Sequence, residues 1–299
     1  MVQKETVRIS VILPVYNGGE YLKKSIQSVL SQSFSHFEFL VIDDCSTDGS
    51  FEWIKEVDDD RIQLHRNQYN RGLFYNLNFL IKLSSGNLIK LWSQDDIMYA
   101  NCLAQVVDFH EKYPNIGFSY SGRDMIDEEG RIKVNLMADN TPEIIPTMLH
   151  AHIAYHTGSI AGNISNTCIT RCALDTVGFF HEGMKISADF DMWVRLAQYF
   201  DTGFIQEKLI QLRDHKSQLS RNEKYYINHV KEDLEVYRYL DNYIGEDMKI
   251  EGRKILRTSK LVFYYTLMIK SLLRGEWRTT RQYYSALSAY DNFFLISLN

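Results

Sequence analysis

Two adjacent carboxylates, Asp95 and Asp96, are the residues whose chemistry most narrows what this protein can do. They follow an apolar run, residues 88–92, that is typical of a buried strand. In open α/β sheets, ligands bind beyond the carboxyl ends of the strands, so acids placed there can hold a divalent cation. Mg²⁺ and Mn²⁺ prefer oxygen ligands and are usually bound by one or two carboxylates together with substrate phosphates. The alternative interpretation is a solvated turn that caps a helix.

Two further acidic pairs lie at the ends of predicted elements. Asp43 and Asp44 follow a second apolar run, and Asp189 and Asp191 lie at the start of a predicted helix. Because parallel strands end at one edge of a sheet, we expect the first pair to converge with Asp95, one site suiting a nucleotide and one a metal. A carboxylate at the third position could act as a general base on an incoming hydroxyl. Alternatively, Asp189 only stabilises its helix, by about 0.3–1 kcal/mol.

The first hundred residues alternate apolar runs with amphipathic stretches. Strands are predicted at residues 8–15, 37–42, 61–65 and 88–92, and helices at 21–31, 50–57 and 73–83. Consecutive βαβ units of this kind predict a doubly wound sheet with right-handed crossovers. The predicted fold class is therefore α/β, with a mostly parallel, Rossmann-like central sheet flanked by helices.

The second part of the chain has a looser pattern that ends in helices. We predict helices at 101–113 and 186–199, strands at 116–120 and 204–212, and helices from 222 to the end with breaks at Gly245 and Gly275. Residues 1–220 are predicted to form one domain, in two parts at about 1–100 and about 101–220. Residues 221–299 are predicted to form a C-terminal helical region.

Composition and motif content argue against several protein classes. The 299-residue chain has a net charge of −5 and a pI near 6.0, which argues against a general nucleic-acid binder. The turn at residues 16–19 lacks the Gly-x-Gly-x-x-Gly pattern of nicotinamide dehydrogenases. We see no apolar stretch of a secretory signal and no run of ~18 uncharged apolar residues, so we expect a cytoplasmic protein.

Six short motifs follow one another along residues 7–220. They are Val-Ile-Leu-Pro-Val-Tyr-Asn at 11–17, Val-Ile-Asp-Asp-Cys-Ser-Thr-Asp-Gly at 41–49, Asn70-x-Gly72 with Asn78 and Gly86, Ser93-Gln94-Asp95-Asp96, Ala-Asp-Phe-Asp-Met-Trp-Val-Arg-Leu at 188–196, and Arg213-x-His215. In this order they resemble the inverting nucleotide-sugar glycosyltransferases of family 2, which have the GT-A fold. The ordered set is far more specific than any single motif.

The resemblance implies a role for each matching residue. It implies contacts with a nucleotide-sugar donor, most naturally a UDP-sugar, from Pro14, Val15, Tyr16, Asn17, Asp44, Asn70, Gly72, Asn78, Ser93, Gln94, Asp95 and Arg213. Asp44 would accept a hydrogen bond from the base. Asp95, Asp96 and His215 would hold Mn²⁺ or Mg²⁺, and Asp189 would be the catalytic base.

The activity implied is transfer of a sugar, with inversion, to a hydroxyl of a saccharide or glycolipid acceptor. The family suggests a nucleotide-binding half at about 1–100, an acceptor-binding half at about 101–220, and cell-surface polysaccharide synthesis at the inner face of a membrane. Peripheral membrane contact through the C-terminal helices is a hypothesis. Two positions depart from the family pattern: Ser93 stands where the first acid of Asp-x-Asp is expected, and Ala188 stands where a Glu is expected. These departures leave open an alternative, a catalytically silent nucleotide-sugar binding or scaffold protein of the same fold.

Overall fold

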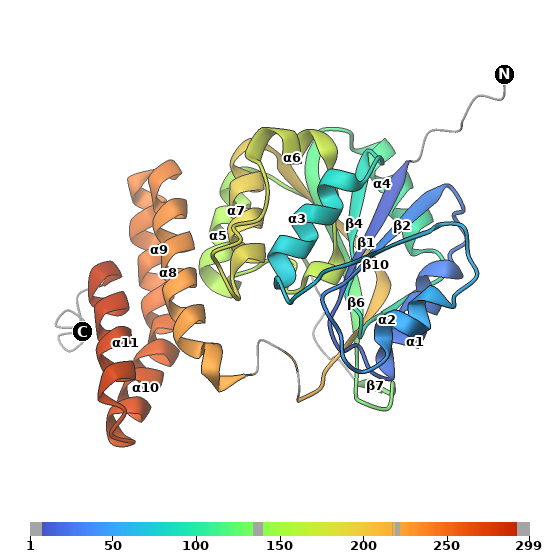
Figure 1. Cartoon of the computed structure of the whole chain (residues 1–299). Coiled ribbons are helices and arrows are strands. Elements are labelled where there is room, and N and C mark those ends of the chain that lie inside the picture. The colour runs from blue at the N-terminus through green and yellow to red at the C-terminus, as the bar shows by residue number, and fades with distance from the viewer. Residues whose placement is uncertain (1–7, 134–139, 217, 219–221, 292–299) are drawn as a thin grey trace. The chain divides into compact units, whose positions relative to one another are not determined.

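A computed structural model describes residues 8–133, 140–216, 218 and 222–291 of the chain (Figure 1). The chain forms two compact units, each built from several separate segments. The first comprises the chain up to Pro146 together with Ala161–Phe180 and Tyr199–His215. The second comprises Thr147–Ile160, His181–Gln198 and the chain from Lys216 onward. Each unit therefore combines segments that are far apart in the sequence.

One mixed sheet lies at the centre of the first unit. Its strands are β1 (Ile9–Val15), β2 (Phe37–Asp43), β3 (Ile62–Arg66), β4 (Leu88–Leu91), β5 (Ile97–Met98), β6 (Ile116–Ile126), β7 (Ile132–Lys133), β8 (Ile144–Ile145), β9 (Thr167–Thr170) and β10 (Asp201–Arg213). They lie in the order β3-β2-β1-β4-β9-β6-β10-β5, with β7 beside β6 and β8 beside β10. Strands β3, β2, β1 and β4 are parallel, as are β6 and β10, which confirms the predicted α/β class.

Strand β9 is the main departure from the predicted topology. It lies antiparallel to both neighbours, pairing Leu88 of β4 with Thr170 and Phe118 of β6 with Ile169. It thereby joins the two parallel sections into one sheet. The same stretch continues into a helix, α6 (Arg171–Val177), and neither element is evident from the sequence pattern.

Helices cover the strands of the first unit because each has one apolar face. They are α1 (Tyr21–Leu30), α2 (Ser50–Lys55), α3 (Leu73–Leu83), α4 (Cys102–Lys112) and α6. In α1, Leu22, Ile26 and Val29 are buried at helical spacing and join the core formed by β1 and β2. All seven residues of β2 are buried, as expected for a strand covered on both faces.

The second unit is helical. It contains α5 (Thr147–Thr157), α7 (Ala188–Tyr199), α8 (Tyr226–Tyr243), α9 (Glu246–Thr258), α10 (Lys260–Leu273) and α11 (Trp277–Tyr290). Helix α5 packs on α9, and α10 packs on both α9 and α11. A Cβ atom at Gly252 would lie 2.4 Å from the Tyr155 ring, so glycine permits the close approach of α9 to α5. Within the described part of the chain, we find no helix that is both long and apolar enough to cross a bilayer.

Candidate active site

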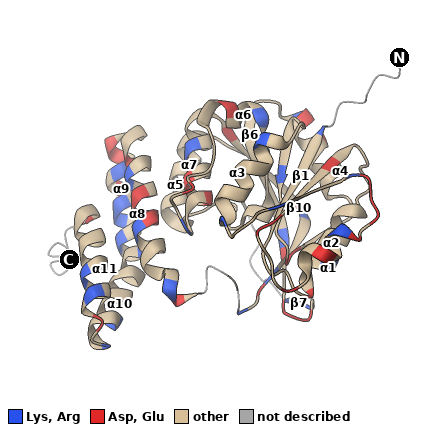
Figure 2. Cartoon of the chain, viewed as in Figure 1, with Lys and Arg blue, Asp and Glu red and all other residues tan. Residues whose placement is uncertain are grey.

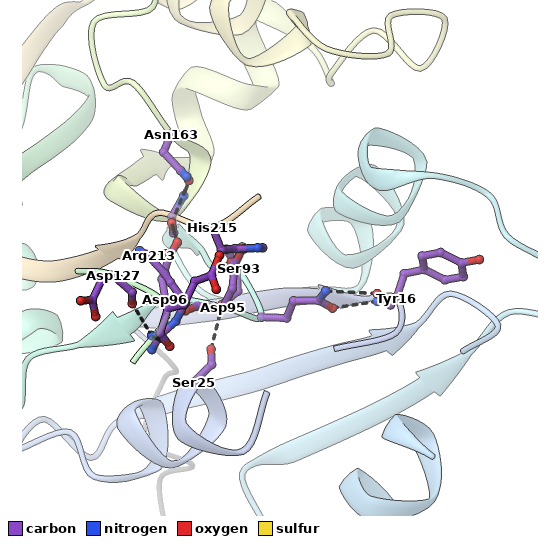
Figure 3. A network of polar contacts seen from close by, with 12 residues as sticks. Tyr16, Ser25, Ser93, Asp95, Asp96, Asp127, Asn163, Arg213 and His215 are labelled. Atoms are coloured by element: carbon purple, nitrogen blue, oxygen red, sulfur yellow. Dashed lines mark hydrogen bonds and ion pairs between the residues drawn. The ribbon is translucent and has the colours of Figure 1, made fainter. Parts of the chain in front are cut away.

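Gln94 joins the loops that follow β1 and β4 at the carboxyl edge of the sheet. Its side-chain oxygen accepts the backbone N–H of Tyr16 at 2.9 Å, and its amide group donates to the Tyr16 carbonyl at 3.1 Å. Pro14 and Val15 lie just before this point, at the end of β1. The Tyr16 ring is 49% exposed and points away from the acidic residues of the site (Figure 3). These predicted nucleotide-lining residues thus lie together at the sheet edge.

Short polar side chains after β2 hold the loop that follows β1. The backbone N–H of Asn17 donates to the Ser46 hydroxyl at 2.9 Å, and the amides of the two glycines that follow donate to Ser50 and Asp48. Asn17 has a positive φ of 48°, a conformation that Asn tolerates better than most residues. Sequence reasoning missed Ser46, Asp48 and Ser50 as supporting residues, although the signal was the run of small polar residues after Asp43.

Asp44 fixes the turn that carries Asn70 and Gly72. One of its oxygens accepts the Asn67 amide at 2.8 Å and the backbone N–H of Arg71 at 2.7 Å, and the other accepts the N–H of Gly72 at 2.9 Å. Gly72 has a φ of 88°, which favours glycine at this position. Asp44 is 3% exposed. It therefore brings together three of the predicted nucleotide-binding positions.

Asp95 and His215 form a hydrogen-bonded pair across 120 residues of sequence. The Nε2 atom of His215 lies 2.8 Å from the Oδ2 atom of Asp95, and the Ser93 hydroxyl donates to the other Asp95 oxygen (Figure 3). Burial alone would raise the pKa of Asp95, but the hydrogen bonds from His215 and Ser93 outweigh it and lower that pKa. Asp95 is therefore a carboxylate at neutral pH, and its side chain remains 19% exposed.

Asp96 has a different environment from its neighbour. It is 1% exposed; one oxygen accepts the backbone N–H of Arg213 at 2.9 Å, and the other accepts the Ser165 hydroxyl. Burial, and after it the charge of Asp95, raises the pKa of Asp96 to about 7. Asp96 is nearly fully buried, whereas the Asp95 side chain is 19% exposed, so the geometry favours a supporting role for Asp96 over the predicted role as a metal ligand.

The Arg213 guanidinium contacts protein carbonyl groups. Its Nε atom donates to the Asp95 carbonyl at 2.9 Å, and one terminal nitrogen donates to the carbonyls of Asp127 at 2.9 Å and Glu128 at 3.0 Å. Arg213 is 2% exposed, and its Cζ atom lies 4.4 Å from the centroid of the Tyr21 ring. It therefore fastens the loop that carries Asp95, and its contact with the nucleotide stays a prediction.

Asn78 is placed by the structure in a packing role. Its amide nitrogen donates to the Phe180 carbonyl and its oxygen accepts the Phe180 N–H, both at 2.9 Å. It is 2% exposed, on the buried side of α3. The predicted contact with the donor is not supported by this geometry, because both polar atoms are used to hold the chain at Phe180.

Asp189 lies in the second unit, where α8 holds the start of its helix. The Glu232 carboxylate accepts the backbone N–H groups of Lys185, Ile186 and Ser187 at 2.8–2.9 Å, immediately before α7. Burial raises the pKa of Asp189 to about 6, and the charge of Asp233 adds to this, although the N–H of Phe190 opposes it. Sequence reasoning missed Glu232, which no motif marks.

Comparison with known proteins identifies the family of this chain. The family described as Glycosyl transferase family 2 matches residues 10–170. An uncharacterised glycosyltransferase of Rickettsia conorii is 30% identical over 255 residues, covering 83% of this chain and 41% of the relative. This chain therefore spans about two fifths of that relative's length.

Two further proteins are informative. The Escherichia coli protein WfgD, named a UDP-Glc:α-D-GlcNAc-diphosphoundecaprenol β-1,3-glucosyltransferase, is 36% identical over 118 residues, covering 40% of this chain and 46% of WfgD. The crystal structure of residues 1–349 of Staphylococcus aureus TarS in complex with UDP-GlcNAc has a TM-score of 0.73 at 18% identity, covering 95% of this chain and 80% of TarS. The chain belongs to glycosyl transferase family 2.

Proposed function

We propose that this protein is an inverting glycosyltransferase that moves a sugar from a UDP-sugar to a hydroxyl group of a saccharide or glycolipid. The observation that carries the proposal is the Asp95–His215 pair, held at 2.8 Å beside loops that are fixed by Asp44 and Gln94. Open α/β sheets bind ligands at this edge. One partly exposed carboxylate at this edge suits a nucleoside diphosphate through a divalent cation that both groups bind.

The donor set of this pair fits a divalent ion. In the described part of the chain, no group of three or more His, Cys, Asp or Glu side chains could hold a metal by itself. Mg²⁺ is commonly bound by one or two carboxylates with substrate phosphates as further ligands, so a protein site of two ligands is sufficient. We assign Asp95 and His215 as these ligands. A bound Mn²⁺ or Mg²⁺ would stabilise negative charge on the departing diphosphate.

Asp189 is proposed as the general base of the transfer. Its carboxylate takes the proton of the acceptor hydroxyl while that oxygen attacks the anomeric carbon and the bond to the diphosphate breaks. A pKa near 6 suits this role, because the group is mostly ionised at neutral pH yet remains basic enough to accept a proton. One displacement of this kind inverts the anomeric configuration.

The names of two relatives support the proposed donor and acceptor classes. WfgD is named for UDP-glucose and a diphosphoundecaprenol-linked acceptor, and TarS has been crystallised with UDP-GlcNAc. These names favour uracil as the base and a lipid-linked saccharide as the acceptor in this protein. A role in cell-surface polysaccharide assembly on the cytoplasmic side of a membrane is part of the same proposal.

The test is release of free nucleoside diphosphate from a panel of UDP-, GDP- and dTDP-sugars with Mn²⁺, with and without a lipid-diphosphate-linked sugar as acceptor. We expect turnover with one UDP-sugar, stimulated by the acceptor and lost in Asp95→Ala and Asp189→Asn. Asp175→Asn, an exposed carboxylate on α6, is the matched control and should keep full activity.

Two other outcomes are informative. Tight UDP-sugar binding without turnover on any acceptor would favour the silent binding protein, the alternative that Ser93 and Ala188 leave open. Absence of UDP binding in calorimetry, together with absence of turnover, would overturn the donor site itself.

A further inference from the structure

Helix α10 carries apolar side chains on two faces. One face packs inside the second unit through Leu261, Tyr264 and others that are nearly fully buried. A second, neighbouring face exposes Val262 by 54%, Ile269 by 46% and Leu273 by 81%. These three positions are spaced by seven and four residues, so they form one stripe along the helix. An exposed apolar stripe of this kind marks an interaction surface.

Helix α11, which packs on α10, exposes aromatic and basic residues. Trp277, at its first position, is 71% exposed, and Tyr284, seven residues later on the same face, is 55% exposed. Arg281 lies between them on that face and is also exposed. Trp and Tyr are the residues enriched where protein meets the boundary between water and lipid.

A basic hollow lies beside Trp277. It is lined by Lys231, Trp277, Arg278, Arg281, Gln282 and Ser285. Within the described residues, Lys231, Arg278 and Arg281 form no ion pair with a carboxylate. Residues 260–290 contain five basic residues and one acidic residue, whereas the whole chain has a net charge of −5 (Figure 2). The hollow is therefore suited to an anion such as a phosphate group.

We propose that the α10–α11 hairpin docks on a membrane that contains anionic phospholipids. The stripe of Val262, Ile269 and Leu273 enters the boundary between headgroups and acyl chains, and the basic hollow takes lipid phosphates. Helix α10 has 14 residues, about 21 Å at 1.5 Å per residue, so it is suited to lie on a bilayer and too short to span it.

Charge favours a lipid surface over a second copy of the chain. A symmetric dimer formed through this face would bring two positively charged hairpins together, and their unpaired cations would repel. An anionic bilayer offers the opposite charge together with an apolar interior. This inference deepens the proposed function, because a lipid-linked acceptor lies at such a surface, but its test needs no nucleotide sugar.

The test is flotation of the full chain with vesicles of phosphatidylcholine alone or mixed with phosphatidylglycerol. Wild type should float with the mixed vesicles, should bind phosphatidylcholine more weakly, and should be released by added salt. Arg278→Gln with Arg281→Gln should lower the partition coefficient roughly 25-fold, since each basic side chain near an anionic surface contributes about fivefold. Ile269→Ser with Leu273→Ser should abolish flotation.

Matched variants in the first unit serve as controls. Leu83→Ser changes a residue of α3 that is 45% exposed, and Lys24→Gln with Lys55→Gln removes two exposed cations. Both should float like wild type, and all the hairpin variants should keep wild-type release of UDP from a soluble donor. Failure of flotation with normal donor turnover therefore overturns the membrane proposal and leaves the proposed function standing.

Three results would overturn the docking proposal. The first is absence of flotation by wild type, or flotation that does not depend on phosphatidylglycerol. The second is loss of flotation only when Phe293→Ser and Phe294→Ser are made beyond α11, outside the described residues, which would assign lipid binding to that segment. The third is a dimer in sedimentation that Leu273→Ser dissociates without any vesicle binding, which would assign the face to a second copy.

Discussion

Two aspartates, one in each unit, have opposite pKa shifts although they are the same residue type. Asp95 is stabilised as a carboxylate by His215 and the Ser93 hydroxyl, and its pKa is lowered. Asp189 accepts the N–H of Phe190 but is dominated by burial, and its pKa is raised to about 6. The first environment keeps a permanent charge, and the second keeps a group that can take up a proton.

The contrast matches the two tasks of the proposed reaction. A carboxylate that holds a cation against a diphosphate should stay ionised at every working pH. A general base works best with a pKa near the working pH. When the environments of two similar groups give them different pKa values, that difference indicates which group has which role. The following experiments test this division of labour.

The largest effect is expected for Asp189→Asn. Removing a general base should lower kcat by about 10²–10⁴, while the dissociation constant of UDP measured by calorimetry should stay within twofold of wild type. UDP affinity should be unchanged because Asp189 is assigned no contact with the nucleotide. A large loss of UDP affinity in this variant would contradict the division of roles between the two aspartates.

Asp95→Asn should have a slightly smaller effect with a different signature. We expect kcat to fall by about 10²–10³, because charge stabilisation in the transition state is lost, together with weaker binding of Mn²⁺. Since the protein supplies two ligands, Mn²⁺ should bind wild type much more tightly when UDP is present, and the variant should lose this enhancement in calorimetric titrations. Equal Mn²⁺ binding with and without UDP would argue against Asp95 and His215 as a metal pair.

Glu232→Gln should reduce kcat by roughly tenfold without a change in KM for the donor. Its carboxylate accepts three consecutive backbone N–H groups before α7, and charged hydrogen bonds contribute about 1.5–3 kcal/mol. The weaker acceptor should let the start of α7, and with it Asp189, move. Exposed Glu235→Gln on the same helix is the control. An equal fall in both variants would point to a general loss of α8 stability.

The smallest effect concerns stability and pH. Because the pKa of Asp189 is higher in the folded protein than its ordinary value of 3.8, its ionisation destabilises the fold above pH about 6, and this penalty disappears as the pH falls toward 4. Asp189→Asn should therefore be more stable than wild type at pH 7.5 by about 1–2 kcal/mol, and equally stable near pH 4. Urea unfolding at the two pH values measures this; a variant less stable at pH 7.5 would refute the raised pKa.

The sequence predicted the strands at the sheet edge well because their signals are local. Each of β1, β2 and β4 is a mostly apolar run that is followed by polar residues, and α3 begins and ends at the predicted residues. Strand β9 was missed because its Thr-Cys-Ile-Thr sequence is only four residues long and has no alternation that distinguishes it from a loop. Its strand conformation depends on pairing with two neighbours.

The roles of individual polar residues were harder to predict. Asn78 and Arg213 match family motifs, yet their polar atoms bind Phe180 and the carbonyls of the Asp95 and Asp127 loops. A motif indicates that a polar residue is needed at a position, but it does not indicate which group the polar atoms of that residue bind. Glu232 lies 43 residues after Asp189 and accepts backbone N–H groups. Since these groups are the same whatever the side chain, no sequence motif marks the contact.

The position of β9 within the sheet has a consequence for synthesis of the chain. Strands β4 and β6 both lack their β9 partner until residues 167–170 have been made, about a quarter of the sequence after β4 begins. A growing chain that has passed β6 thus holds unpaired apolar edges on both strands while it is still on the ribosome, the condition under which edges pair wrongly. Ribosome-bound chains that stop before β9 should therefore recruit general chaperones more strongly than chains that extend beyond it.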